Sequence, residues 1–164
     1  MASATYLQSL DSVYENGDSR GVTPSNRRQI ESFIAKEVIA IGDWLAFDIA
    51  AVADGDVTLG IYKADANSAP VRPAFGVALE AATAADVTAS KAIQVCISGV
   101  CDASVGDNGG AGSAIGTLLQ TTTTAGTVDV AAAASALPVC GILAEIIPAA
   151  AGITLKRVVV RKSF

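Results

Sequence analysis

Histidine is absent from this chain of 164 residues, and aromatic side chains make up only 5% of it. The absence of histidine removes the commonest general base and metal ligand. There are three cysteines, Cys96, Cys101 and Cys140, and an odd number at these spacings predicts neither a disulfide framework nor a zinc site. We predict that they are small buried hydrophobic residues. A Cys96–Cys101 disulfide across a turn at Gly99 is the alternative.

Sequence motifs for catalysis and cofactor binding are also missing. The chain has no Gly-x-Ser-x-Gly elbow. The glycine-rich stretch 110–116 has the wrong spacing for a dinucleotide fingerprint, and poor helix formers follow it. The acids at 54–56 and 102–107 do not continue into the ligand loop of a calcium site. We therefore predict that the protein is not an enzyme and has no catalytic residue, metal or cofactor.

Positive charge is scarce in the middle of the chain. The formal net charge is −5, which argues against nucleic acid as a partner. Between residues 37 and 155 there are only three bases, whereas Lys156, Arg157, Arg161 and Lys162 follow with no acid. These basic ends are either solvated or dock on an acidic partner.

No charged segment followed by an apolar run opens the chain, so we expect no secretory signal. The stretch 128–155 is nearly all apolar, but Pro138, Glu145 and Pro148 interrupt it. We interpret it as buried strands and predict no membrane span.

The chain contains an internal repeat. The stretch 73–80, Pro-Ala-Phe-Gly-Val-Ala-Leu-Glu, returns 65 residues later as Pro-Val-Cys-Gly-Ile-Leu-Ala-Glu at 138–145. An Ala-Ile-Gly-x-apolar-Leu motif precedes each copy, at 40–45 and 114–119. The residues that define the repeat are Gly42, Trp44, Pro73, Gly76 and Glu80 in the first copy and Gly116, Pro138, Gly141 and Glu145 in the second. This self-similarity predicts two similar structural units, at about 40–100 and 114–161.

Two repeat residues invite a functional reading. Glu80 and Glu145 could form a catalytic carboxylate pair, but sugar-stacking aromatic residues are lacking nearby. Because they are equivalent in the repeat, we expect each to have the same structural role at a strand end. Trp44, the only tryptophan, is expected to fill the core or a subunit interface.

Short runs of β-forming residues separated by Gly, Asp and Pro predict an all-β barrel or sandwich. The expected strands are 44–47, 57–62, 74–79, 92–102, 115–121, 127–130, 139–146 and 153–160, with a polar turn at 83–86. The stretch 23–41 is ambiguous, since its apolar spacing fits a helix and a strand at 29–35 is the alternative.

The first 28 residues read as an extended N-terminal arm, and residues 29–164 as a β-rich domain. The arm is polar and is broken by Asn16-Gly17 and Gly21, so it cannot bury enough apolar surface alone. We predict that it binds a neighbouring subunit. Its anchors are Tyr6, Leu7, Leu10 and Tyr14, and its polar rim is Arg20, Arg27 and Arg28.

The motif order resembles that of the small capsid decoration, or cement, proteins of tailed bacteriophages. The matching motifs are A-I-G-D-W-L-A-F-D at 40–48, P-x-F-G-V-A-L-E-A-A at 73–82 and I-Q-V-C-I-S-G-V at 93–100, followed by a glycine-rich link and P-x-x-G-I-L-x-E at 138–145. The resemblance covers about residues 29–161 and favours the strand at 29–35. It implies a compact barrel or tulip-like subunit, usually a homotrimer, that binds the major capsid protein.

By this resemblance the protein lies on the outer capsid surface of the virion and stabilises the shell against the pressure of packed DNA. It would be made in the host cytoplasm, would not be secreted, and would bind neither nucleic acid nor membrane. One alternative is a phage fibre or tail subunit, or a bacterial surface-layer subunit. Another is a lipoyl-like carrier or ligand-binding barrel, because Lys63 lies in Tyr-Lys-Ala-Asp.

Overall fold

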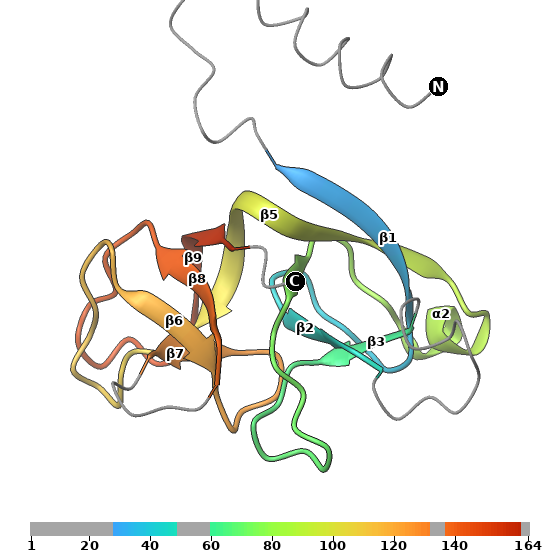
Figure 1. Cartoon of the computed structure of the whole chain (residues 1–164), viewed down its shortest axis with the longest axis horizontal. Coiled ribbons are helices and arrows are strands. Elements are labelled where there is room, and N and C mark those ends of the chain that lie inside the picture. The colour runs from blue at the N-terminus through green and yellow to red at the C-terminus, as the bar shows by residue number, and fades with distance from the viewer. Residues whose placement is uncertain (1–27, 49–59, 132–136, 162–164) are drawn as a thin grey trace, which may run out of the picture.

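The computed structural model describes residues 28–48, 60–131 and 137–161, and within them the fold is all-β, as the sequence predicts (Figure 1). The strands are β1 (Gln29–Ala35), β2 (Trp44–Phe47), β3 (Gly60–Lys63), β4 (Gly76–Ala78), β5 (Ala92–Val105), β6 (Leu118–Thr121), β7 (Val128–Val130), β8 (Val139–Leu143) and β9 (Thr154–Val160). A short helix, α2 (Ala84–Thr88), precedes β5.

The strands close into two rings that share β5. The N-terminal ring has the strand order β1-β3-β2-β4-β5 and closes where β1 pairs with β5. The C-terminal ring has the order β5-β7-β6-β8-β9 and closes where β9 pairs with β5. The first half of β5, up to Ser98, pairs with β1, and the second half, from Gly99, pairs with β9.

The two rings have the same topology. The parallel pair β1–β3 of the N-terminal ring corresponds to the parallel pair β5–β7 of the C-terminal ring, and every other neighbouring pair is antiparallel in both. The first ring is formed by strands between residues 29 and 98 and the second by strands between 99 and 160. The segment 40–100 contains β2, β3, β4 and the first half of β5, which all belong to the N-terminal ring. The segment 114–161 contains β6, β7, β8 and β9 of the C-terminal ring.

The Ala-Ile-Gly motifs form equivalent turns before β2 and β6. Gly42 and Gly116 both have φ of +88°, a left-handed conformation that glycine adopts without strain. The N–H of Gly42 donates to the carbonyl of Ala78 at 2.9 Å, and the N–H of Gly116 donates to that of Leu143 at 2.8 Å. Each turn is therefore tied to the strand that follows a repeat proline, β4 in one ring and β8 in the other.

The repeat glycines of β4 and β8 lie where a side chain would not fit. A Cβ on Gly76 would lie 2.8 Å from Val95 Cγ1, and a Cβ on Gly141 would lie 2.9 Å from Trp44 Cη2. Both distances are below ordinary van der Waals contact. The repeat thus preserves glycine because neighbouring side chains occupy the space above the strand.

Buried apolar side chains form two adjoining cores. The core of the N-terminal ring includes Phe33, Leu45, Ile61, Phe75, Ile93, Val95 and Ile97, and Phe47 stacks on Phe75 with ring centroids 3.8 Å apart. The second core includes Trp44, Val77, Cys96, Leu119, Val128, Leu143, Val158 and Val160, and so contains residues from both rings. The rings are packed against each other as well as joined by β5.

Two local expectations are decided by hydrogen bonding. The strand at 29–35 is confirmed and the helix alternative is wrong, because this segment pairs with β5 on one edge and β3 on the other. The expected polar turn at 83–86 is wrong, since α2 begins there. Thr83 and Asp86 form a reciprocal capping box, which satisfies the free N–H groups of the first helical turn.

Candidate interaction surfaces

Trp44 lies in the core, as predicted, and its indole contacts the other ring. Its side chain is fully buried, its Cη2 atom is the nearest neighbour of Gly141, and its backbone N–H donates to the carbonyl of Gly126 at 2.9 Å. Leu118, the residue at the equivalent position of the C-terminal ring, is 45% exposed. The two copies of the repeat therefore differ in side chain and in burial at this position, where the first copy contacts the second.

The repeat glutamates each pair with a lysine. Glu80 lies 3.1 Å from Lys91 Nζ, and Glu145 lies 3.0 Å from Lys156 Nζ. Glu145 also accepts the backbone N–H of Arg157 at 3.4 Å. The hydrogen bond from Lys156, followed by that from the Arg157 backbone, lowers the pKa of Glu145 below its usual value. These contacts fit a structural role for both glutamates.

All three cysteines are buried and free. The thiol–thiol hydrogen bond with Cys96, together with burial, raises the pKa of Cys101, and burial raises the pKa of Cys140 to about 12. The same hydrogen bond lowers the pKa of Cys96. Because the thiolate is the nucleophile, the protonated thiols of Cys101 and Cys140 are poorly suited to covalent chemistry. The prediction of small buried hydrophobic residues agrees with these positions.

Large apolar side chains are exposed at several turns, and sequence reasoning missed them. Among the described residues, six are more than half exposed: Val38 (54%), Ile41 (58%), Ile115 (63%), Ile146 (60%), Ile153 (56%) and, within β9, Leu155 (57%). Ile41 and Ile115 are equivalent in the repeat, each directly before the left-handed glycine of its turn. We call these two turns the isoleucine turns. The sequence signal that could have pointed to these two is the isoleucine placed before the turn glycine in both copies of the repeat.

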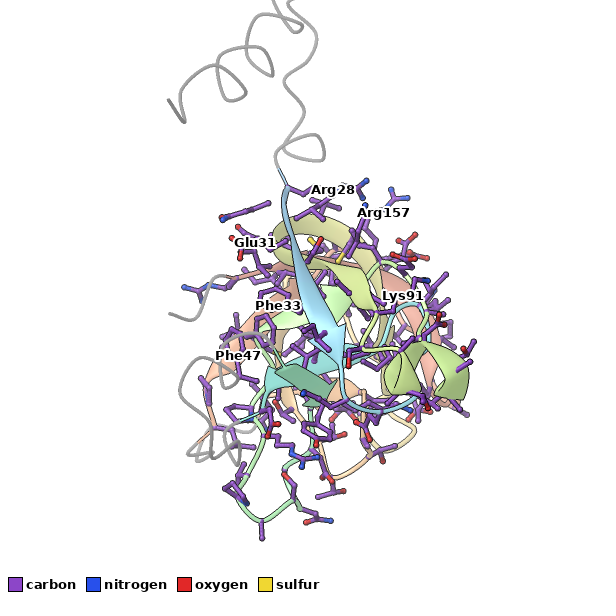
Figure 2. The ribbon with its side chains drawn as sticks, turned by 90° about the vertical axis from the view of Figure 1, so that its right-hand side faces the viewer. Arg28, Glu31, Phe33, Phe47, Lys91 and Arg157 are labelled. Carbon is purple, nitrogen blue, oxygen red and sulfur yellow. The ribbon has the colours of Figure 1, made fainter. Side chains whose placement is uncertain are left out.

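A surface hollow of about 440 Å³ lies where β1 begins and where β5 and β9 pair. Its lining consists of Arg28, Ile41, Leu79, Val100, Cys101, Asp102 and Arg157. Figure 2 shows Arg28 and Arg157 together at this end of the molecule. Arg28 is the one predicted arm residue that is described. The other six, Tyr6, Leu7, Leu10, Tyr14, Arg20 and Arg27, lie outside the described residues.

The charges around this hollow are weakly paired. Arg157 Nε lies 3.9 Å from an Asp102 carboxylate oxygen, and both side chains are about two-thirds exposed. A long, exposed ion pair of this kind contributes little stability. Arg157 can therefore exchange Asp102 for another carboxylate at small cost.

Acid should loosen the loop that Asp107 ties together. The Asp107 carboxylate accepts the N–H of Gly152 at 2.8 Å and that of Gly110 at 2.9 Å. These bonds lower its pKa from the ordinary 3.8. Because the pKa is depressed in the folded state, this stabilisation is present above pH 3.8 and is lost as the pH falls below it.

We therefore expect the Tm to fall in this acid range, and Asp107→Asn to lower the Tm at neutral pH while flattening its dependence on acid. Calorimetry from about pH 6 to about pH 2 measures both effects. Asp102→Asn is the control, since it removes only the long pair with Arg157. Identical acid profiles for wild type and Asp107→Asn would contradict this account.

Lys63 lies within β3, where its Nζ is 3.5 Å from an Asp43 carboxylate oxygen, and not at a hairpin tip. Asp54 and Asp56 lie outside the described residues. Across residues 28–48, 60–131 and 137–161, no group of three or more acidic or cysteine side chains is placed to hold a metal. The described part of the chain also contains no helix with the length and apolarity to cross a membrane.

The chain matches no protein-family model and no curated protein sequence. The geometry of the isoleucine turns and of the hollow is therefore the basis for assigning a role.

Proposed function

We propose that the protein is a structural virion protein that binds the outer surface of a major capsid protein shell. In this role it acts as a decoration, or cement, subunit, assembles as a homotrimer, and stabilises the shell against the internal pressure of DNA. The observation that carries the proposal is the pair of exposed isoleucine turns, Ile41 and Ile115. The motif order over residues 29–161, which resembles that of phage decoration proteins, supports it.

Exposed apolar side chains at equivalent turns favour a binding role. Isoleucine at 58% and 63% exposure leaves apolar surface in water, and contact with a partner would bury it. The two turns belong to rings of the same topology, so they can present similar surfaces to two similar sites. A shell built from many copies of one protein offers such repeated sites.

Two linked contacts bind more tightly than either alone. Once one turn is seated, the second binds at a high effective concentration, so the pair can exceed the single affinity by orders of magnitude. A clamp of this kind stabilises a shell by binding energy alone. No reacting group is required of the subunit.

Substitution at the isoleucine turns should weaken binding to shells. We expect Ile41→Asp and Ile115→Asp each to lower the affinity for shells stripped of this protein about tenfold or more, as expected for central apolar contacts. The double variant should lose more than either single variant, because the linkage is also lost. Occupancy measured by cryo-electron microscopy and by co-sedimentation checks both expectations.

Val71→Asp is the matched control, since Val71 is 42% exposed but lies outside the repeated turns. Wild-type occupancy of shells by the double variant would contradict the proposal.

The second candidate is a fibre, tail or surface-layer subunit built with the same apolar turns. Recovery of the wild-type protein in fibres or tails of purified particles, or in a bacterial surface layer, would favour it.

A further inference from the structure

The hollow at the start of β1 is lined by apolar and charged side chains. Ile41, Leu79 and Val100 supply apolar surface, Arg28 and Arg157 supply positive charge, and Asp102 supplies one negative charge, which is only weakly paired with Arg157. The hollow is open to solvent, and its volume of about 440 Å³ gives room for a few side chains. The chemistry that fits it is an apolar segment flanked by carboxylates.

The chain itself contains such a segment. Residues 6–18 carry three acids, Asp11, Glu15 and Asp18, and no base. The same stretch holds the apolar side chains Tyr6, Leu7, Leu10, Val13 and Tyr14, at a spacing that groups them on one face of a helix. An apolar face with adjacent acids complements a lining that holds apolar side chains and two arginines.

The start of β1 favours a second copy as the source of this segment. The first four residues of β1 are exposed, including Ile30 at 39%. Figure 1 shows that the first half of this strand, in blue, lies at the edge of the described fold. Arg28 itself lines the hollow, so only the nine residues 19–27 are available to turn the segment 6–18 back into the hollow of its own chain. The nine residues between the segment 6–18 and Arg28 can span about 30 Å when extended, enough to reach the hollow of an adjacent copy.

We propose that the hollow lined by Arg28, Ile41, Leu79, Val100 and Arg157 receives residues 6–18 of a second copy of this chain. The inference rests on the proposed function in one respect, that the decoration subunit is a homo-oligomer. Arm and hollow are different surfaces, so the contact is head-to-tail. Contacts of this type form closed rings when the rotation between copies allows closure, as it does in a cyclic trimer.

The test uses the free full-length protein, without shells. Light scattering coupled to size-exclusion chromatography gives the oligomeric state across a dilution series. We expect Leu10→Asp combined with Tyr14→Asp to raise the concentration of half-dissociation at least tenfold. Arg28→Glu combined with Arg157→Glu should do the same, and circular dichroism confirms that each variant is folded.

A charge swap tests the contact itself. Adding Asp11→Lys and Glu15→Lys to the Arg28→Glu, Arg157→Glu variant should restore the oligomer at least in part, because the signs again match. Arg161→Glu is the control, since Arg161 is exposed, undergoes the same charge change and does not line the hollow. Dissociation by Arg161→Glu equal to that caused by the hollow variant, or no rescue by the swap, would overturn the proposal.

A photo-crosslinking residue at position 10 identifies the occupant. In a mixture of isotopically light and heavy chains, we expect mass spectrometry to find mixed crosslinks to the β5 peptide that contains Val100. Crosslinks only within one chain would assign the hollow to the chain's own arm, and crosslinks to another surface or a monomeric wild type would also overturn the proposal. Shell binding is scored separately with Ile115→Asp, because Ile41 also lines the hollow and Ile115 does not. An arm-dependent oligomer that does not occupy shells refutes the proposed function alone, and an arm-independent oligomer that occupies shells refutes this inference alone.

Discussion

Replacing Trp44 with alanine should lower the free energy of unfolding by about 3–5 kcal/mol, the range for loss of a large buried aromatic side chain. Trp44 is fully buried and belongs to the core that both rings share. Removing the indole leaves a void between β2 and β8 that rigid strands cannot close. Urea denaturation followed by far-ultraviolet circular dichroism measures the change, since the only tryptophan is lost.

The repeat supplies a matched control for this substitution. Leu118 holds the equivalent position in the C-terminal ring but is 45% exposed. Leu118→Ala should therefore cost well under half as much, because less apolar surface is lost from contact. If Trp44→Ala and Leu118→Ala lowered the free energy of unfolding by equally small amounts, the indole would not join the two rings.

Gly141→Ala should destabilise the protein by about 1–3 kcal/mol, as added volume in a packed core does. The new Cβ would lie 2.9 Å from Trp44 Cη2 and 3.1 Å from the carbonyl oxygen of Val159. The indole can move only by disturbing its own packing, and the carbonyl belongs to the neighbouring strand β9. The same denaturation experiment measures the effect.

A double-mutant cycle separates the two contacts. In a Trp44→Leu background the indole is gone, so the penalty of Gly141→Ala should fall to the part caused by the Val159 carbonyl. Gly76→Ala is the control, because its Cβ would meet Val95 and the Cys96 carbonyl, and Trp44 is not among its nearest neighbours. Strict additivity of Trp44→Leu and Gly141→Ala would contradict the predicted clash.

The sequence predicted the strands better than their pairing. β-Forming runs bounded by glycine, aspartate and proline mark local structure, so β2 (Trp44–Phe47) was located and the other strand centres were close. Ring closure depends on β5 meeting β1 and β9, segments about 60 residues away on either side, and no local pattern encodes such pairing. The helix α2 was missed although Thr83 and Asp86 stand at capping-box spacing, a signal that was present.

The candidate surfaces were less predictable than the fold. Periodicity shows which residues of a segment share a face and cannot show that Ile41 and Ile115 are exposed, so only the structure reveals these surfaces. The hollow brings Arg28 beside Arg157, and only the pairing of β5 with both terminal strands places them together. The buried position of Trp44 could be predicted, because a large aromatic side chain within a β-forming run is stabilised by burial in the core.

The continuous backbone of β5 fixes the span of the molecule. Gly99, with φ of +106°, bends the strand, but Ser98 is paired with Gln29 and Gly99 with Val160, so the bend is held on both sides and is no hinge. The distance between the two isoleucine turns is therefore fixed by the fold. In the proposed shell-binding role, such a rigid subunit loses little conformational freedom on binding. The proposed binding would also depend on distance, because a lattice with a different repeat would contact only one of the two turns.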